Sequence, residues 1–348
     1  MKKLKIGIVG AGTAGLAFAT LMARNQHDVH VFEAVPESKP VGAGLLLQPS
    51  AQKVLSELGV LDPLQTKCSR IDDLIGYNQW RIRVLNLRYQ DYREKAYGLG
   101  VHRAQLALAL TQAALQMNVK IRYHNNIDNI NNGVLYQNGE ALDSFDLIVV
   151  ANGTRSRLRE VLNFQHKTTP YPWGAFWIVV DSDRWSHTNT LMQKYRGAKR
   201  MMGALPTGEN PQTGQSCYSL FWSVAKKDKP QLDEYNDSDW QHMMNEHWPE
   251  AQALTLAIKR RDLCWAEYSD VYMTHFFKDN VVFVGDAAHA MSPQLGQGAN
   301  LALVDAYVLW HASRICDSVP EMLARYQAKR RQQLDYYRRA SRFMTPLY

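Results

Sequence analysis

Cysteines, long apolar runs and signal-peptide features are scarce or absent in this sequence, and each lack excludes a class of protein. Four cysteines are spread over 348 residues without a CxxC pair, so the sequence indicates no disulfide framework, zinc site or redox dithiol. No stretch approaches the roughly 20 apolar residues that a membrane-spanning helix needs. The first residues lead directly into a strand pattern rather than a signal peptide. We therefore expect a cytoplasmic protein without a bound metal.

The positive charge of the chain is concentrated near its end. The formal net charge is +7, and the segment from Glu321 to Tyr348 carries seven Arg or Lys residues against two acidic ones. The pattern is typical of a solvated helix face, and contact with an anionic membrane is the alternative. No nucleic-acid-binding motif accompanies these charges, so nucleic acid is not an expected partner. The 46% of hydrophobic residues is enough for one large or two modest domains.

The start of the chain follows the pattern of a dinucleotide-binding βαβ unit. An apolar strand, three glycines in a GxGxxG arrangement, a helical pattern and a second strand succeed one another between Lys5 and Phe32. In such a unit Gly10 makes the tight turn, Gly12 admits a pyrophosphate to the helix N-terminus, and Gly15 lets helix and strand pack closely. Glu33, at the end of the second strand, is placed to accept hydrogen bonds from ribose hydroxyls.

A second GxGxxG is lacking. The pairs Gly42/Gly44, Gly98/Gly100 and Gly296/Gly298 each lack the third glycine. A single unit of this kind predicts one resident dinucleotide.

The most informative stretch lies at residues 281–306. Four apolar residues predict a short buried strand that ends just before Asp286. A loop stiffened by Pro293 follows, in which Gly296 and Gly298 let the backbone approach a flat ligand. The apolar run from residue 299 to 309 predicts a buried helix, whose N-terminus favours negative charge.

The segment GDAAHAMSPQLGQGANLALVDA within this stretch resembles the second flavin-binding motif of the class A flavoprotein monooxygenases, the para-hydroxybenzoate hydroxylase-like family. Together with the single GxGxxG unit, the resemblance implies bound FAD and a transient NADH or NADPH. Asp286 is then expected to hold a ribityl hydroxyl, and Arg103 to lie near the FAD phosphates and ribityl chain. The full set of expected cofactor contacts is Gly10, Gly12, Thr13, Ala14, Gly15, Glu33, Ala34, Gly44, Arg103, Asp286, Pro293, Gly296, Gln297, Gly298 and Ala299.

One further segment is similar to the family and another departs from it. The residues from Pro40 to Pro49 are similar to the family's Gly-Ala-Gly segment, which passes the flavin. Where relatives carry Ala-Asp-Gly, this chain has Asn152 in place of the aspartate, although Ser156 and Arg159 match. An amide keeps an acceptor but loses the charge, so Asn152 bears on how the reduced nicotinamide is handled.

The composition changes near residue 165, after which most of the tryptophans occur. Segments at residues 173–180, 200–205 and 217–224 predict strands, and a helical pattern from about residue 238 to 259 is expected to cover them. We therefore predict an α/β fold, with a Rossmann-type FAD-binding domain and a second, mostly β-sheet substrate domain. The predicted FAD-binding domain comprises residues 1–70, 98–165 and 276–348, and the substrate domain residues 71–97 and 166–275.

Two polar residues of the predicted substrate domain are candidate catalytic groups. Arg200 is a candidate to hold a carboxylate or enolate, and Tyr218 to orient or deprotonate a phenol. A structural role for each stays open, because one sequence does not show which face of a strand points inward. His289 is expected to position its loop.

The resemblance implies that NAD(P)H reduces the flavin, dioxygen adds at flavin C4a, and the resulting hydroperoxide hydroxylates an aromatic or heteroaromatic small molecule. A flavin halogenase is less consistent with the sequence, which has no WxWxIP segment. Two alternatives remain: a flavin dehydrogenase or reductase without oxygen insertion, and a flavin-binding protein that has lost turnover, which Asn152 leaves open. A monomer or a homodimer is expected.

Overall fold

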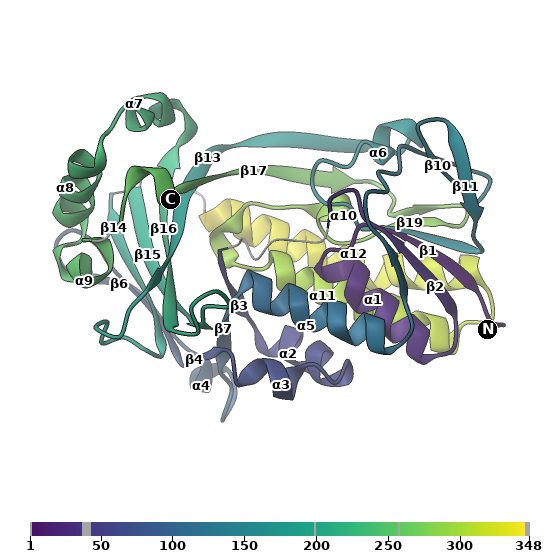
Figure 1. Cartoon of the computed structure of the whole chain (residues 1–348), viewed down its shortest axis with the longest axis horizontal. Helices are drawn as coiled ribbons and strands as arrows, with labels where there is room; N and C mark the ends of the chain where they lie inside the picture. The colour runs from purple at the N-terminus through teal and green to yellow at the C-terminus, as the bar shows by residue number, and fades with distance from the viewer. Residues whose placement is uncertain (1, 37–42, 198–199, 257, 345–348) are drawn as a thin grey trace.

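The computed structural model describes residues 2–36, 43–197, 200–256 and 258–344. Two sheets lie at opposite ends of an elongated molecule, and two long strands, β13 and β17, run from one end to the other (Figure 1). Of the Pro40–Pro49 segment, Pro40 to Gly42 fall outside the described residues.

The first sheet is the Rossmann-type sheet that the sequence predicts. Its strand order is β18-β19-β12-β1-β2-β8, and β1 pairs in parallel with both β2 and β12. Parallel strands covered on both faces read as continuous apolar runs, and all four residues of β12 are buried. The strands are β1 (Lys5–Val9), β2 (Asp28–Phe32), β8 (Lys120–Arg122), β12 (Leu147–Val150), β18 (Phe277–Lys278) and β19 (Val281–Phe283).

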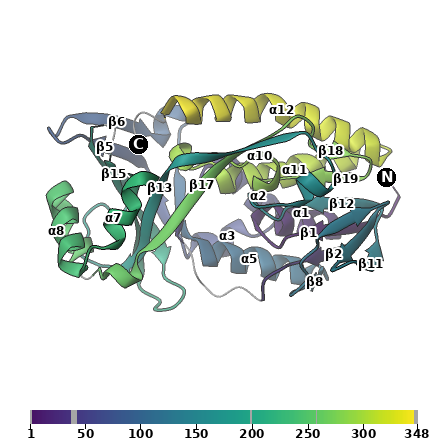
Figure 2. The same ribbon diagram turned by 90° about the horizontal axis from the view of Figure 1, so that it is seen from above.

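Helices cover this sheet, and one long helix, α12, runs along much of the molecule. The buried helix α11 extends further than the sequence predicts, from Gly298 to Ile315. Figure 2 shows α12 running along the molecule toward the strands β5 and β6. No described helix is long and apolar enough to span a bilayer. The helices of this part are α1 (Thr13–Arg24), α2 (Pro49–Glu57), α3 (Leu61–Gln65), α5 (Arg103–Gln116), α6 (Leu158–Val161), α10 (Asp286–His289), α11 and α12 (Val319–Met344). The single turn α4 (Tyr89–Tyr92) follows β6 in the 71–97 segment.

Part of the basic character of α12 is internal. Arg330 is fully buried, and its Nε lies 2.6 Å from Asp305. Arg331 donates to the carbonyl oxygens of Met273 and Thr274. These two cations therefore hold α12 to the protein rather than facing solvent.

The second sheet has the order β17-β13-β16-β15-β14-β5-β6. Its strands are β5 (Asp73–Tyr77), β6 (Arg83–Arg88), β13 (His166–Asp181), β14 (Thr190–Arg196), β15 (Arg200–Glu209), β16 (Ser216–Ala225) and β17 (Cys264–Met273). β5 and β6 come from the 71–97 segment, as the predicted substrate domain requires. The exact domain boundaries stay predictions.

The second sheet has two chemically different faces, because successive side chains of a strand point to opposite sides. On one face, Met202, Leu220 and Trp222 pack with Trp240 of α8 (Asp237–His247). We call this the α8 face; α7 (Lys229–Asp233) and α9 (Gln252–Thr255) lie at the same end of the molecule. The other face receives β3 (Gly44–Leu47), and we call it the β3 face. β3 pairs with β7 (Gly98–His102), which pairs with β4 (Ser69–Ile71).

A remaining small sheet, β9 (Asn129–Asn131), β10 (Val134–Gln137) and β11 (Glu140–Ser144), lies at the end of the molecule that holds the first sheet (Figure 1).

Candidate functional site

The glycine loop after β1 has the geometry of a phosphate-binding turn. Gly10 has φ +108°, which only glycine adopts readily. A Cβ on Gly15 would stand 2.1 Å from the Gly10 carbonyl oxygen, so Gly15 is required by close packing. A Cβ on Gly12 would meet nothing nearer than 3.9 Å. The protein itself therefore does not require glycine at position 12, whereas an approaching pyrophosphate would.

The N-terminus of α1 is open toward this loop. Gly12 caps the helix without a side-chain hydrogen bond, and no acidic residue lies in the first turn. The first amide groups of a helix lack intrahelical partners and carry the positive end of the dipole. Thr13, Ala14 and Gly15 form that first turn, where an anionic group would be stabilised.

The Glu33 carboxylate closes the loop from the neighbouring strand. Its Oε2 accepts a hydrogen bond of 2.7 Å from the amide of Ala11, and its Oε1 one of 3.0 Å from the amide of Val35. Each carboxylate oxygen has two lone pairs, so both retain capacity for ribose hydroxyls. Ala34, next in sequence, is exposed beside them.

The 285–299 segment returns to the same region. Gly285 has φ +58°, and it turns the chain from β19 into the short helix α10, which begins at Asp286. A Cβ on Gly298 would lie 4.0 Å from Asp286 Oδ1. Burial raises the pKa of Asp286, while the nearby charges of His289 and Arg103 oppose that shift. The structure thus brings together Asp286, Gly298 and Arg103 from three separate segments.

A buried ionic network holds this turn in place. Asp305 of α11 accepts hydrogen bonds from the amide of Gly285 (2.7 Å) and from Arg330 Nε (2.6 Å), and lies 2.5 Å from His289 Nε2. Burial raises the pKa of the Asp305 carboxyl, but the charges of His289 and Arg330 outweigh this and hold the pKa well below its usual range. The contact with Asp305 therefore ties His289, to which the sequence assigned no catalytic role, to this turn. The roles of Asp305 and Arg330 in this network were not predicted from the sequence. An acidic residue inside an otherwise apolar helix, such as Asp305, could have indicated a buried ionic contact.

The loop between α10 and α11 is tied to β13, and the first turn of α11 is tied to β3. Pro293 begins a short turn, Pro293–Leu295, and Gly296 ends it with φ +60°. The Gln294 side chain donates to the Tyr171 hydroxyl on β13. Asn300 Nδ2 donates to the Leu46 carbonyl oxygen at 2.9 Å. Gln297 caps α11, and Gly298 and Ala299 begin it, so all three lie next to the contact between Asn300 and β3.

Gly44 has a role that the sequence did not indicate. A Cβ there would stand 2.1 Å from Thr207 Cγ2 and 2.7 Å from Ser219 Cβ. Close packing of β3 on the second sheet is sufficient to require glycine at this position. The contact also identifies Thr207 and Ser219 as members of the β3 face.

The segment that departs from the family lies against the glycine loop. The Asn152 side chain is exposed, and a Cβ on Gly10 would stand 2.9 Å from Asn152 Cα. Arg159 is buried and donates to the carbonyl oxygens of Ala287 and Thr154, each at 2.7 Å. Arg159 therefore joins this segment to α10.

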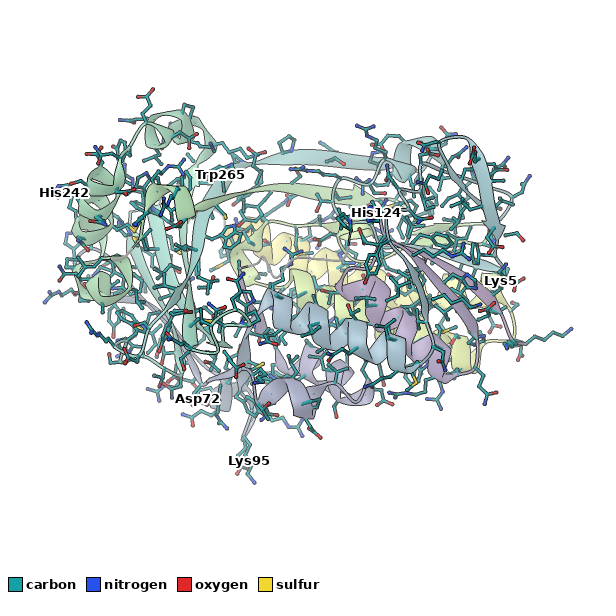
Figure 3. All side chains as sticks on the ribbon, viewed as in Figure 1. Lys5, Asp72, Lys95, His124, His242 and Trp265 are labelled. Atoms are coloured by element: carbon teal, nitrogen blue, oxygen red, sulfur yellow. The ribbon has the colours of Figure 1, made fainter. Side chains whose placement is uncertain are left out.

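Arg200 and Tyr218 lie on the α8 face of the second sheet, and their contact with the substrate stays a prediction. Tyr218 packs in the apolar cluster of the α8 face, and its hydroxyl lies 3.5 Å from the Trp185 carbonyl oxygen. Arg200 shares its face with Met202, and its charge acts on Glu246 and His247 of α8. Figure 3 shows His242 of α8 and Lys5 of β1 at opposite ends of the molecule, so the α8 face points away from the glycine loop.

The side chains that face the other way come from the intervening positions of the same strands. Tyr195 and Met201 form a buried cluster with Phe221 packed against it. The Tyr195 hydroxyl donates to Gln193 Oε1 at 2.8 Å. A Cβ on Gly203 would stand 2.1 Å from the Phe221 ring, which explains the glycine. Gln193 and Tyr195 were not among the predicted site residues, because β14 was not among the predicted strands.

Among the described residues, no group of three or more His, Cys, Asp or Glu side chains is arranged to hold a metal ion.

Comparison with known proteins places this geometry in a family. Residues 3–337 match the model of a family described as an FAD binding domain. The 6-hydroxynicotinate 3-monooxygenase of Bordetella bronchiseptica is 26% identical over 329 residues, covering 88% of this chain and 82% of that protein. The 2-heptyl-3-hydroxy-4(1H)-quinolone synthase of Pseudomonas aeruginosa is 24% identical, covering 96% and 87%.

Solved structures share the fold at lower identity. The 2-methyl-3-hydroxypyridine-5-carboxylic acid oxygenase in its tetrameric form has a TM-score of 0.86 at 23% identity, covering 99% of this chain and 93% of that one. Pseudomonas aeruginosa PqsL in complex with 2-aminobenzoylacetate also has a TM-score of 0.86, at 19% identity, covering 99% and 96%.

Proposed function

Because the chain belongs to the FAD-binding-domain family, we propose that it is an FAD-dependent monooxygenase that uses NADH or NADPH and dioxygen to hydroxylate an aromatic or heteroaromatic ring. The observation that carries this proposal is the meeting of the Gly10–Glu33 unit with the Asp286–Gly298 turn. Both segments are of the kinds that hold a flavin dinucleotide, and they lie near the β3 face of an aromatic-rich sheet.

The residues of the site fit FAD. The open N-terminus of α1 and the free space at Gly12 suit the pyrophosphate. Glu33 has unused lone pairs for the adenosine ribose. Asp286 is surrounded by protein, which raises its pKa, but its side chain is still accessible beside Gly298 and could accept from a ribityl hydroxyl. Bound FAD would supply the transfer of electrons from NAD(P)H and of oxygen to the substrate.

The protein's own contribution is binding, orientation and exclusion of water. The network of Asp305, His289 and Arg330 fixes the backbone of Gly285, which determines where Asp286 points. Gly296 and Gly298 leave the loop backbone free to approach a flat ring. The Phe221 ring offers an apolar surface on the β3 face, and a dry surface suppresses loss of the activated oxygen to solvent.

Labelled dioxygen gives the direct test. The purified yellow protein would be supplied with NADH or NADPH, heavy dioxygen and a panel of hydroxylated rings, with peroxide measured in parallel. Label in a hydroxylated product, with little peroxide, is the expected result. NAD(P)H oxidation that yields unlabelled product would instead favour the dehydrogenase or reductase alternative. Absence of any ring-stimulated NAD(P)H oxidation would favour a protein that binds flavin without turnover.

Asn152 provides a further check on the last alternative. If the amide limits the reaction with nicotinamide, Asn152→Asp is expected to accelerate flavin reduction without changing flavin content. The cytoplasmic location and the choice between monomer and homodimer stay predictions from the sequence.

A further inference from the structure

The β3 face of the central strands carries no charge in the part of the chain that the structure describes. β14, β15 and β16 contain four charged residues, namely Lys194, Arg196, Arg200 and Glu209. Lys194 and Arg196 point to Glu250 and Glu246 on the α8 side, at 4.0 and 2.9 Å. Arg200 lies on that side too, and Glu209 is paired with Lys67 at 2.7 Å at the far end of β15.

A row of positions on the β3 face extends beyond the contact with β3. Leu191 and Leu205 pack on Leu46 of β3, and the next position along β14 is Gln193. Tyr195 follows it on the same face. Both side chains are at least nine-tenths buried, at 7% and 8% exposure. They lie beside Met201, Gly203 and Phe221, on a face that also carries the hydroxyl groups of Ser219 and Ser223.

Gln193 and Tyr195 do not use all of their hydrogen-bonding groups within the protein. The Tyr195 hydroxyl uses its proton on Gln193 Oε1, and its oxygen can still accept. The Gln193 amide nitrogen points at Met201 Sδ, 3.9 Å away, which is a weak acceptor and engages one of two protons. Burial raises the pKa of Tyr195 to about 12, so it stays a neutral phenol at physiological pH. The pair therefore offers one free N–H donor and one free oxygen acceptor.

We propose that the substrate is an uncharged ring without a carboxylate. The ring carries an adjacent hydrogen-bond donor and acceptor, as in a lactam or in a ring nitrogen next to a hydroxyl-bearing carbon, and these hydrogen-bond to Gln193 and Tyr195. This inference rests on the proposed function, since it concerns the same site. A buried carboxylate needs a cation or several donors to offset the loss of its hydration. The Arg200 that the sequence suggested for this task faces the other way, and no described residue of β14 to β16 replaces it.

Binding to the FAD-loaded protein tests the proposal with matched pairs of probes. The neutral probes are 2-hydroxypyridine and 4-hydroxyquinoline, and their partners are 6-hydroxynicotinate and 4-hydroxyquinoline-2-carboxylate. Each is titrated against the flavin absorbance spectrum. The neutral member of each pair is expected to bind at least about tenfold more tightly. Tighter binding of the carboxylates, or no response to any probe, would overturn the proposal.

Variants on one strand connect the preference to the residues. Gln193→Leu and Tyr195→Phe should each weaken the neutral probes by about fivefold to a hundredfold, as for a lost buried hydrogen bond. Tyr195→Arg should shift the preference toward the carboxylates. Lys194→Met is the matched control, because it lies between the two on β14 and faces Glu250, and it should leave the preference unchanged. Equal effects of all the substitutions would refute the role of Gln193 and Tyr195.

The titration needs neither NAD(P)H nor dioxygen, so failure of the substrate-class proposal can be distinguished from failure of the proposed function. Selective binding without labelled product would remove the monooxygenase proposal and keep the substrate class. Labelled product formed from carboxylates alone would do the reverse.

Discussion

The buried carboxylate of Asp305 is the residue whose removal we expect to have the largest effect on stability. Asp305 and Arg330 both have side chains with 0% exposure. Asp305→Asn keeps the shape of the side chain but leaves the guanidinium of Arg330 buried without a counter-ion. Breaking a buried pair from one side costs about 3–5 kcal/mol. We expect the free energy of unfolding of the flavin-loaded protein to fall by that amount in urea titration at pH 7.

The pH dependence gives a second signature of the same residue. The pKa of Asp305 is held below its usual range in the folded protein. A carboxyl with a depressed folded pKa contributes stability that is fully present above its unfolded pKa, about 3.9, and is lost as pH falls toward the folded pKa. The gap between wild type and Asp305→Asn should therefore be constant from pH 7 to about pH 5 and shrink below about pH 4.

Two companion variants complete the test. Asp305→Asn combined with Arg330→Met removes both charges, and it should cost less than the single Asp305→Asn change because no charge remains buried alone. Asp335→Asn is the half-buried control, since Asp335 is paired with Arg338 at 3.0 Å on α12, where solvent still reaches both side chains, and should change stability by less than about 1 kcal/mol. A loss below 1 kcal/mol for Asp305→Asn, or simple additivity in the double variant, would refute the reasoning.

The remaining predictions concern the cofactor loop and one buried histidine. Gly12→Ala should leave the stability of the flavin-free protein unchanged, since its Cβ has open space, yet weaken FAD binding about tenfold or more, measured by flavin retention. Gly15→Ala should instead lower the yield of folded protein, because its Cβ would overlap the Gly10 carbonyl; the opposite order would contradict both assignments. Glu33→Gln should weaken FAD binding about tenfold in equilibrium dialysis, because charge-assisted hydrogen bonds are lost. Burial lowers the pKa of His247 to about 4, so wild type should lose about 3 kcal/mol of stability between about pH 6.5 and 4, and His247→Gln should show a flatter urea-titration profile there.

The first sheet and its cofactor segments could be predicted because their signals are local. Apolar runs give β1, β12 and β19, the segment DVHVF gives β2, and the glycine spacing gives the turn before α1. The GxGxxG glycines, Glu33 and Asp286 could therefore be identified from short stretches of sequence. The network of Asp305 and Arg330 could not, since the two residues belong to different helices and meet only after α11 and α12 pack.

The second sheet was harder because β14 lacks a clear strand pattern. Its seven residues, TLMQKYR, mix a glutamine, a lysine and an arginine with apolar residues. Both faces of β14 are covered, so apolar residues occur on each, Leu191 on the β3 face and Met192 on the α8 face, and the usual alternation of apolar and polar residues is lost. β14 was therefore missing from the prediction, and with it Gln193 and Tyr195.

A single contact would have sufficed to assign the faces of all these strands. Side chains alternate with a period of two, and the register of the antiparallel pairs places Ala204 opposite both Met192 and Leu220. Once Gly44 is known to pack on Ser219, Tyr218 must lie on the opposite face. Whether Tyr218 or Tyr195 lies on the β3 face thus depends on the packing of β3 against β16, two strands far apart in the sequence. Composition and local pattern carry no information about that approach, because it is set by how the two sheets pack.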